Sequence, residues 1–161
     1  MGASAVSIGS LLFSFQGRTS RQPYWLVSIA MIALSVLIWS ILAFGRGWVL
    51  PADTGRLDAV KLLLVASYVP FLWIALAVGA KRLHDRGRSA WWLLPFYILP
   101  SILEGAGGRA GSLGILFVLA SLAITIWAVI ELGFLRGAPG PNAYGPDPLA
   151  DGPASQPEWK A

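Results

Sequence analysis

The sequence predicts an all-α integral membrane protein: a four-helix bundle with a short N-terminal interfacial segment and a disordered C-terminal tail. Of its 161 residues, 56% are hydrophobic and only 12% are charged, whereas soluble domains carry roughly a quarter charged residues. The apolar residues gather into four runs, and most cations lie between those runs. Cysteine is absent, which excludes disulfides, a thiol nucleophile and a Cys-ligated metal.

Four membrane spans are predicted at about residues 22–44, 60–84, 90–108 and 112–135. The first span contains no charged residue, and at ~1.5 Å per residue it is long enough to cross a ~30 Å hydrocarbon core. Ahead of it, Leu11 to Phe15 is expected to lie along the membrane interface or to pack under the bundle. Residues 1–148 form one transmembrane domain. Residues 149–161 are expected to be a disordered cytoplasmic tail.

A short polar turn joins the second and third spans. Gly87 suits the left-handed residue that follows a helix C-terminus, and Ser89 suits the N-cap of the next helix. The third apolar run, Ala90 to Leu103, is short for a span. It becomes long enough to cross a membrane only if the helix continues through Glu104 to residue 108.

The cations are distributed unequally between the two sides that four spans would create. Eight Lys and Arg residues fall on the side of the termini, and four fall on the other side. Because cytoplasmic loops carry the excess of Lys and Arg, both termini are expected in the cytoplasm. This pattern favours a role in topology over binding to nucleic acid.

Three sequence blocks stand out: FQGRTSRQPYW, KRLHDRGRSAWW and GAPGPNAYGPDP. With these blocks the chain resembles DUF805, a bacterial inner-membrane family of unknown function. The family's patterns are F-x-G-R-x-S-R-x-x-F/Y-W, R-R-L-H-D-x-G-x-S-G-W-W and G-x-x-G-x-N-x-Y-G-x-D-P. The likeness covers about Phe13 to Pro148, with Lys81 where the family favours Arg and Ala90 where it favours Gly. It implies a small four-helix protein of the bacterial plasma (inner) membrane, and it implies no reaction.

Four spans would place all three blocks on one face, at the cytoplasmic surface. Their polar residues are candidates for a site that binds an anionic headgroup or a partner, because guanidinium forks pair well with phosphate. The candidates are Arg18, Arg21, Arg82, His84, Asp85, Arg86, Arg88, Asn142, Tyr144 and Asp147. The alternative is that the arginines only fix topology while Asp85 and Asp147 neutralise their neighbours.

Two further ionisable residues have simple interpretations. His84 stands beside Asp85, but adjacent helical residues do not face each other, so we predict no catalytic residue here. A hydrogen-bonded or headgroup-contacting His84 is favoured instead. Glu131 is an intramembrane ionisable group near the end of the fourth span. Pairing with a cytoplasmic arginine is favoured over a role in a proton or ion pathway.

The sequence therefore predicts a non-enzymatic membrane module whose Arg-rich face binds anionic lipid headgroups or a partner protein. A small transporter or channel component is one alternative, which a polar stripe or an inverted repeat in the sequence would favour. An enzyme acting on a lipid phosphate is another, which a group of nucleophilic or metal-binding residues would favour. We expect no cofactor, no metal and no nucleic acid. The expected partners are membrane lipids, including anionic ones, a second copy of the chain, or another membrane protein.

Overall fold

The computed structural model describes residues 7–49 and 54–150, without the side chains of residues 42–49, 54–61 and 63–65. Within these ranges the regular structure is entirely helical, which confirms the predicted class, and the pair Asn142 and Gly145 forms an isolated bridge. The elements are α1 (Ile8–Phe13), α2 (Arg21–Val49), α3 (Thr54–Asp85), η1 (Ala90–Trp92), α4 (Leu93–Gly107), η2 (Gly111–Leu113), α5 (Gly114–Val129) and η3 (Ile130–Phe134).

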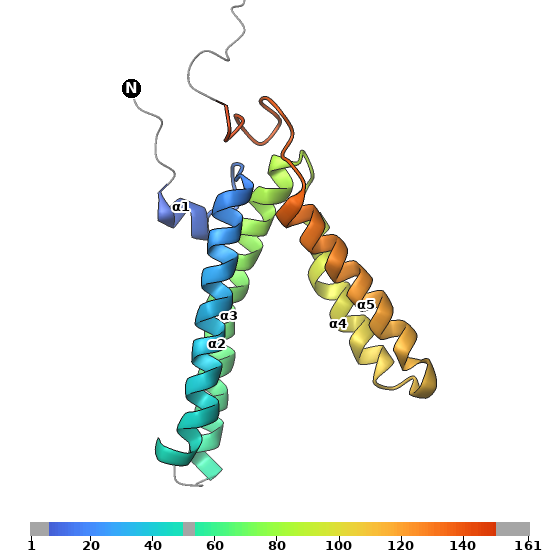
Figure 1. Cartoon of the computed structure of the whole chain (residues 1–161). Coiled ribbons are helices and arrows are strands. Elements are labelled where there is room, and N and C mark those ends of the chain that lie inside the picture. Colours follow the sequence, from blue (N-terminus) through green and yellow to red (C-terminus); the bar gives the residue numbers. More distant parts are fainter. Residues whose placement is uncertain (1–6, 50–53, 151–161) are drawn as a thin grey trace, which may run out of the picture.

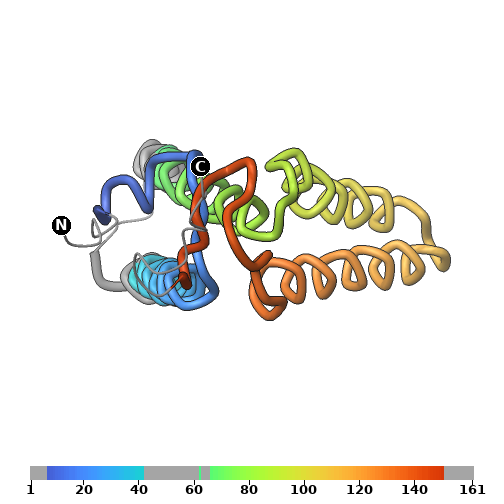
Figure 2. The backbone as a smooth tube through the Cα atoms, turned by 90° about the horizontal axis from the view of Figure 1, so that it is seen from above, coloured from blue at the N-terminus to red at the C-terminus, as the bar shows by residue number. Residues whose placement is uncertain are grey.

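The long helices form two antiparallel pairs that share one end (Figure 1). Helices α2 and α3 lie side by side, and so do α4 and α5. The view from above in Figure 2 shows the two pairs extending in different directions. The described helices thus form two diverging hairpins, and a bundle closed along its whole length is not present among them. The tightly packed part of the fold is the shared end.

Two of the helical stretches are long and apolar enough to cross a membrane, judged by length and composition over the described residues. They are Arg21–Ile41, in the predicted first span, and Gly111–Phe134, in the predicted fourth span. The second and third spans stay predictions. Most large apolar side chains on these two stretches are exposed, for example Trp39 at 61% and Leu119 at 54%. In water such a surface would be costly, whereas hydrocarbon chains can cover it.

The turn between α3 and α4 has the geometry that its sequence predicted. Gly87 has φ +70°. Its N–H donates to the carbonyl of His84 at 2.9 Å, and the N–H of Arg88 donates to the carbonyl of Leu83 at 2.9 Å. This pair of bonds closes the C-terminus of α3. The hydroxyl of Ser89 accepts from the N–H of Trp91, so Ser89 caps the next helical turn as expected.

A small apolar core lies where the two hairpins meet. Its buried members come from α3, α4 and η3, namely Ala80, Leu83, Leu93, Phe96 and Leu132. Short helix α1 packs on α3, where the buried ammonium of Lys81 donates to the carbonyls of Ser10 and Leu11. A cation at these carbonyls offsets the negative end of the α1 dipole. The shared end is therefore held by both apolar packing and polar contacts.

The last part of the chain makes a compact turn. The N–H groups of Leu149 and Ala150 donate to the side chain and the carbonyl of Asp147, respectively. The rest of the predicted disordered tail, residues 151–161, lies outside the described residues.

Candidate functional site

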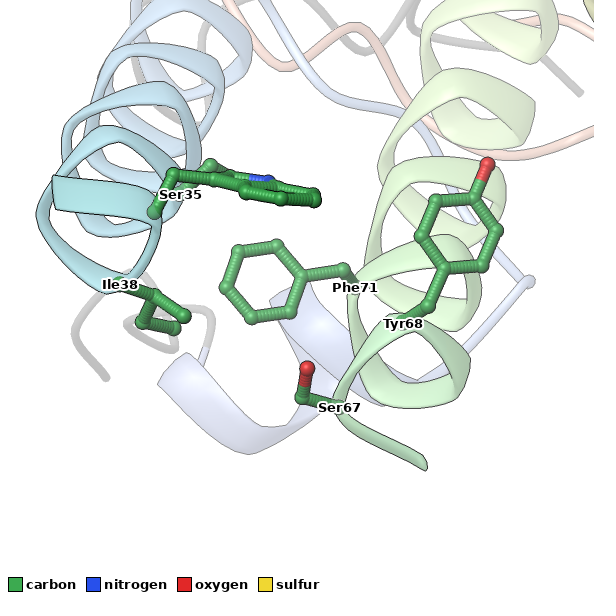
Figure 3. Close-up of a pocket in the computed structure, with 6 residues that line it drawn as sticks. Ser35, Ile38, Ser67, Tyr68 and Phe71 are labelled. Atoms are coloured by element: carbon green, nitrogen blue, oxygen red, sulfur yellow. The ribbon is translucent and has the colours of Figure 1, made fainter. Parts of the chain in front are cut away.

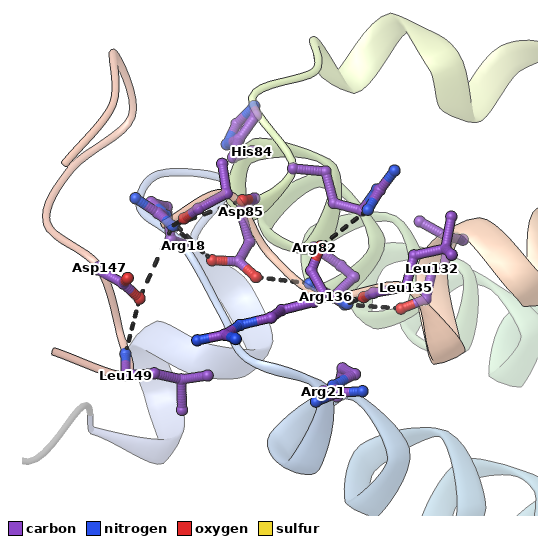
Figure 4. A network of polar contacts seen from close by, with 12 residues as sticks. Arg18, Arg21, Arg82, His84, Asp85, Leu132, Leu135, Arg136, Asp147 and Leu149 are labelled. Carbon is purple, nitrogen blue, oxygen red and sulfur yellow. Dashed lines mark hydrogen bonds and ion pairs between the residues drawn. The ribbon is translucent and has the colours of Figure 1, made fainter. Parts of the chain in front are cut away.

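The three sequence blocks meet at the shared end of the two hairpins, as Figure 4 shows. Arg18 comes from the loop before α2, Arg82 and Asp85 come from the last turn of α3, and the third block follows η3. We call Arg18, Arg82 and Asp85, together with the carbonyls that they bind, the arginine clasp. It joins the first helix pair to the second.

Arg18 lies at the centre of the clasp, with only 1% of its side chain exposed. Its Nη1 and Nη2 donate to the carbonyls of Gly140 and Ala138, each at 2.6 Å. Its Nε donates to Oδ1 of Asp85 at 3.1 Å. A buried guanidinium is costly unless its donors are satisfied. Here the third block supplies carbonyls that the loop itself does not use.

Arg82 is fully buried and reaches the end of the last helix. Its Nε donates to the carbonyl of Leu132 at 2.7 Å, its Nη1 to Oδ2 of Asp85, and its Nη2 to the carbonyl of Leu135. Residues 130–134 form a π-helical turn. Terminal carbonyls of a helix lack partners within it and carry partial negative charge, so a buried cation is favourable there.

Asp85 therefore bridges two arginines, Arg18 from the loop before α2 and Arg82 from its own helix. Its backbone carbonyl also accepts from the N–H of Ala138 at 2.8 Å. Gly137 passes so close that an added Cβ would lie 2.0 Å from Oδ2 of Asp85. Only glycine fits at this crossing.

The third block is fixed by a second set of contacts. The amide of Asn142 donates to the carbonyl of His84 at 2.9 Å, and its Oδ1 accepts from the N–H of Tyr144 at 2.9 Å. The rings of His84 and Tyr144 stack with 3.9 Å between centroids and 4° between planes. Nδ1 of His84 lies 3.2 Å from the carbonyl of Gly17. Because a carbonyl only accepts, Nδ1 carries the proton in this contact.

Asp147 stabilises the loop of the third block, whose carbonyls bind Arg18. Its Oδ1 and Oδ2 accept from the N–H groups of Leu149 and Gly140 at 2.9 and 3.0 Å. Its Oδ1 also lies 3.9 Å from Nη2 of Arg18. These N–H groups, that of Leu149 foremost, and the charge of Arg18 lower the pKa of Asp147 below its ordinary value. Asp147 therefore balances the second positive charge of the clasp.

A second group of arginines surrounds the end of η3. Nε of Arg86 donates to Oε1 of Glu131 at 2.7 Å, and Nε of Arg88 lies 3.2 Å from the same oxygen. Nη1 of Arg86 donates to the carbonyl of Arg136 at 2.8 Å, and Nη1 of Arg21 donates to the carbonyl of Phe134 at 3.2 Å. We call Arg21, Arg86, Arg88 and Arg136 the arginine ring. Glu131 is paired with two of its members.

The structure divides the predicted site residues into three roles. Arg18, Arg82 and Asp85 are buried and bound to protein atoms, so they are not free to bind a ligand in this arrangement. Asn142, Asp147 and the His84–Tyr144 stack hold the third block in place. Arg21, Arg86 and Arg88 lie at the surface or partly exposed. His84 and Asp85 contact different groups, so they form no dyad.

Two residues at this end are absent from the predicted set. Arg136 belongs to the ring, and its position directly after the last apolar run was a usable signal. Gly137 touches Asp85 across the fold, and a lone glycine in a glycine-rich loop carries no sequence signal for such a contact.

Fold and site define a class: an all-helical protein with two apolar segments of membrane-crossing length, joined by an arginine clasp built from three motif blocks. Comparison with known families identifies the family. Residues 12–146 match the family described as "Protein of unknown function (DUF805)". The chain belongs to this family.

Three curated relatives are proteins of Escherichia coli (strain K12). "Uncharacterized protein YiiR" is 33% identical over 154 residues, which cover 88% of this chain and 90% of the relative. "Inner membrane protein YhaH" is 31% identical and covers 83% of this chain and 86% of the relative. "Inner membrane protein YhaI" is 27% identical, with 83% and 85% covered. No solved structure gives a significant match.

Proposed function

We propose that this chain is a multi-pass protein of the bacterial inner membrane whose arginine ring binds the headgroups of anionic lipids at the cytoplasmic surface. Two relatives, YhaH and YhaI, are named inner membrane proteins, which supports the proposed location. Four spans and cytoplasmic termini are part of the proposal, as is the absence of an enzymatic activity. A second copy of the chain or another membrane protein is a partner that the same surface could accept.

The observation that carries the proposal is the difference in charge balance between the clasp and the ring. In the clasp, Arg18 and Arg82 are matched by Asp85 and Asp147. In the ring, Glu131 pairs with Arg86 and Arg88, and among the described side chains no ion pair joins a carboxylate to Arg21 or Arg136. The positive surplus of this end therefore lies in the ring.

The ring also has the exposure and the geometry that headgroup binding requires. Arg21 and Arg136 are exposed, and 35% of the Arg88 side chain is exposed. The guanidinium of Arg88 lies 5.0 Å from the ring centroid of Trp92, a contact that steadies the cation. Guanidinium forks can bind phosphate oxygens bidentately. At a membrane surface each such cation is worth about 1 kcal/mol toward anionic lipid.

The test is a double variant, Arg21→Gln with Arg136→Gln, in the full chain purified in mild detergent. These two residues are chosen because neither contacts Glu131 in the structure, so no buried carboxylate loses its partner. Binding of phosphatidylglycerol and of phosphatidylcholine is measured by native mass spectrometry. At about 1 kcal/mol per cation, the double variant should bind phosphatidylglycerol about 30-fold more weakly.

The matched control is Arg109→Gln, which removes a cation from the α4–α5 turn at the opposite end, where its side chain donates to the carbonyl of Gly105. This variant should bind both lipids as the parent does. Equal binding of phosphatidylglycerol by the double variant and the parent would refute the headgroup proposal. A loss of subunits instead of lipid from the double variant would point to a protein partner at the ring.

A further inference from the structure

A cavity of about 340 Å³ lies beside the clasp, between the end of α3, the start of α4 and the third block. All three sequence blocks contribute to its wall. Phe15 comes from the first block, His84, Ser89 and Trp91 from the second, and Tyr144 from the third. Among the described contacts, none of these five side chains donates to or accepts from the clasp arginines, so the cavity gives these five motif residues a common location.

Its size separates this cavity from two others. One of about 180 Å³ lies between α2 and α3, where Figure 3 shows Ser35, Ile38 and Phe71 on its wall. Another, of about 240 Å³, lies among Tyr24, Tyr97 and Ala128. Sites for small organic ligands span roughly 300–1,000 Å³. The cavity beside the clasp falls within that range, whereas the other two fall below it.

The wall of the cavity is amphipathic. Leu76, Leu93 and Leu94 line it together with the aromatic rings, while His84 and Tyr144 provide polar atoms. Nδ1 of His84 is bound to the carbonyl of Gly17, which leaves Nε2 of the neutral ring as an acceptor. The hydroxyl of Tyr144 can donate or accept. A matching ligand has an apolar chain and an uncharged hydrogen-bonding group at its end.

The position of the cavity selects among such ligands. It lies where the apolar helices give way to the polar clasp, and Trp91, on its wall, is 73% exposed. Exposed tryptophans are typical of the headgroup level of a membrane. A lipid at that level has its ester and headgroup at the depth of His84 and Tyr144, and its chain at the depth of the leucines.

We infer that this cavity holds one acyl chain of a membrane lipid, with an ester oxygen accepting from the hydroxyl of Tyr144 and a headgroup hydroxyl donating to Nε2 of His84. The inference rests on the membrane location proposed above, but it does not rest on the arginine ring. The ring attracts the charge of a headgroup, whereas the cavity recognises a chain. The two sites are therefore separable by experiment.

The test uses the full chain in nanodiscs of phosphatidylethanolamine and phosphatidylglycerol, each doped in turn with a version of that lipid carrying a photoactivatable group at the end of one chain. Cross-links mapped by peptide mass spectrometry should concentrate at Leu76, Leu93 and Leu94. Replacing Ala90, which also lines the cavity, with Phe should remove most of them. The milder Ala90→Leu, expected to preserve folding more readily, should remove a part.

The matched control is Ala128→Phe, which fills the 240 Å³ cavity and should leave the cross-links at Leu93 and Leu94 unchanged. Cross-links spread evenly over exposed residues such as Leu34 of α2, and unchanged by both Ala90 variants, would overturn the acyl-chain site but leave the membrane location intact. If the protein gives no lipid cross-links at all, both the acyl-chain site and the membrane location are overturned.

Discussion

At the scale of residues, Arg18 joins two separate parts of the chain, the end of α3 and the third block. It binds Asp85 and the carbonyls of Ala138 and Gly140 at once. Replacement by Gln should lower the free energy of unfolding by about 3 kcal/mol. This is the lower end of the range for breaking a buried pair, because Arg82 still faces Asp85. Thermal unfolding in mild detergent measures the loss.

The matched control for this prediction is Arg109→Gln, since Arg109 is an exposed cation in the α4–α5 turn. It should unfold at nearly the temperature of the parent. If Arg18→Gln does so as well, the clasp is a consequence of the fold and does not stabilise it.

Asp147 makes stability depend on pH in a defined direction. Its pKa is lowered below the ordinary value of 3.8, chiefly by the N–H of Leu149. A carboxyl with a lowered pKa contributes stability above its unfolded pKa, and the contribution is lost as the pH falls through its folded pKa. Asp147→Asn should therefore unfold at a lower temperature than the parent at pH 7. The difference should shrink as the pH falls below about 3.8, and a constant difference would contradict the assignment.

The residues of the clasp were predictable from the sequence, but their partners were not. Arg18, Arg82 and Asp85 belong to conspicuous blocks. Their main partners, however, are backbone carbonyls of residues 132–140. A carbonyl is present at every residue, so nothing in the letters of the sequence indicates which one an arginine will bind.

At the scale of elements, the α4–α5 hairpin depends on a close approach of two glycines near its turn. A Cβ added to Gly114 would lie 2.6 Å from the carbonyl oxygen of Gly107, which is backbone and cannot rotate away. Gly114→Ala should therefore push the helices apart and destabilise the hairpin by about 1–3 kcal/mol. Hydrogen exchange of α4 and α5 would locate the effect.

The same hairpin offers a control in Gly105 of α4, where an added Cβ would meet only the end of the Arg109 side chain at 3.9 Å. Gly105→Ala should be neutral or stabilising, because Ala loses less backbone entropy than Gly in a helix. Similar losses in the two variants would mean that the contact of Gly114 with Gly107 does not matter.

The existence of each long helix was predictable because apolar runs and turn residues mark it. Gly87 and Ser89 fixed the turn after α3. The π-helical turn at residues 130–134 was not predictable. It provides the Leu132 carbonyl that Arg82 binds, and Arg82 lies about fifty residues earlier in the chain.

At the scale of the whole molecule, the divergence of the two helix pairs (Figure 1) was also beyond the sequence. Hydropathy reports which segments prefer hydrocarbon. It does not report which helix packs on which, because lipid chains are as apolar as leucine side chains. The clasp joins the two pairs at one end, and within the second pair Oγ of Ser121 donates to Oε1 of Glu104; hydropathy indicates neither contact.

The shared end also makes the topology of the chain testable as a unit. Gly87 and the segment after η3 both adjoin the clasp, whereas the end of α2, the start of α3 and the α4–α5 turn lie at the far ends of the hairpins (Figure 1). If the clasp lies in the cytoplasm, as proposed above, reporter fusions at Gly87 and after Lys160 should both read cytoplasmic. Fusions near Gly55 and at Gly111 should read external.

The pattern of these four reporters separates two ways in which the topology could be wrong. If all four are reversed, the orientation is wrong but the four spans and the clasp remain, since Gly87 and the C-terminal segment still share a side. If Gly87 and Lys160 report opposite sides, the clasp cannot form across the membrane, because Arg18 would have to reach Asp85 and Gly140 at once. That outcome would refute the four-span topology. It would also refute the acyl-chain cavity, whose wall needs all three blocks on one side of the membrane.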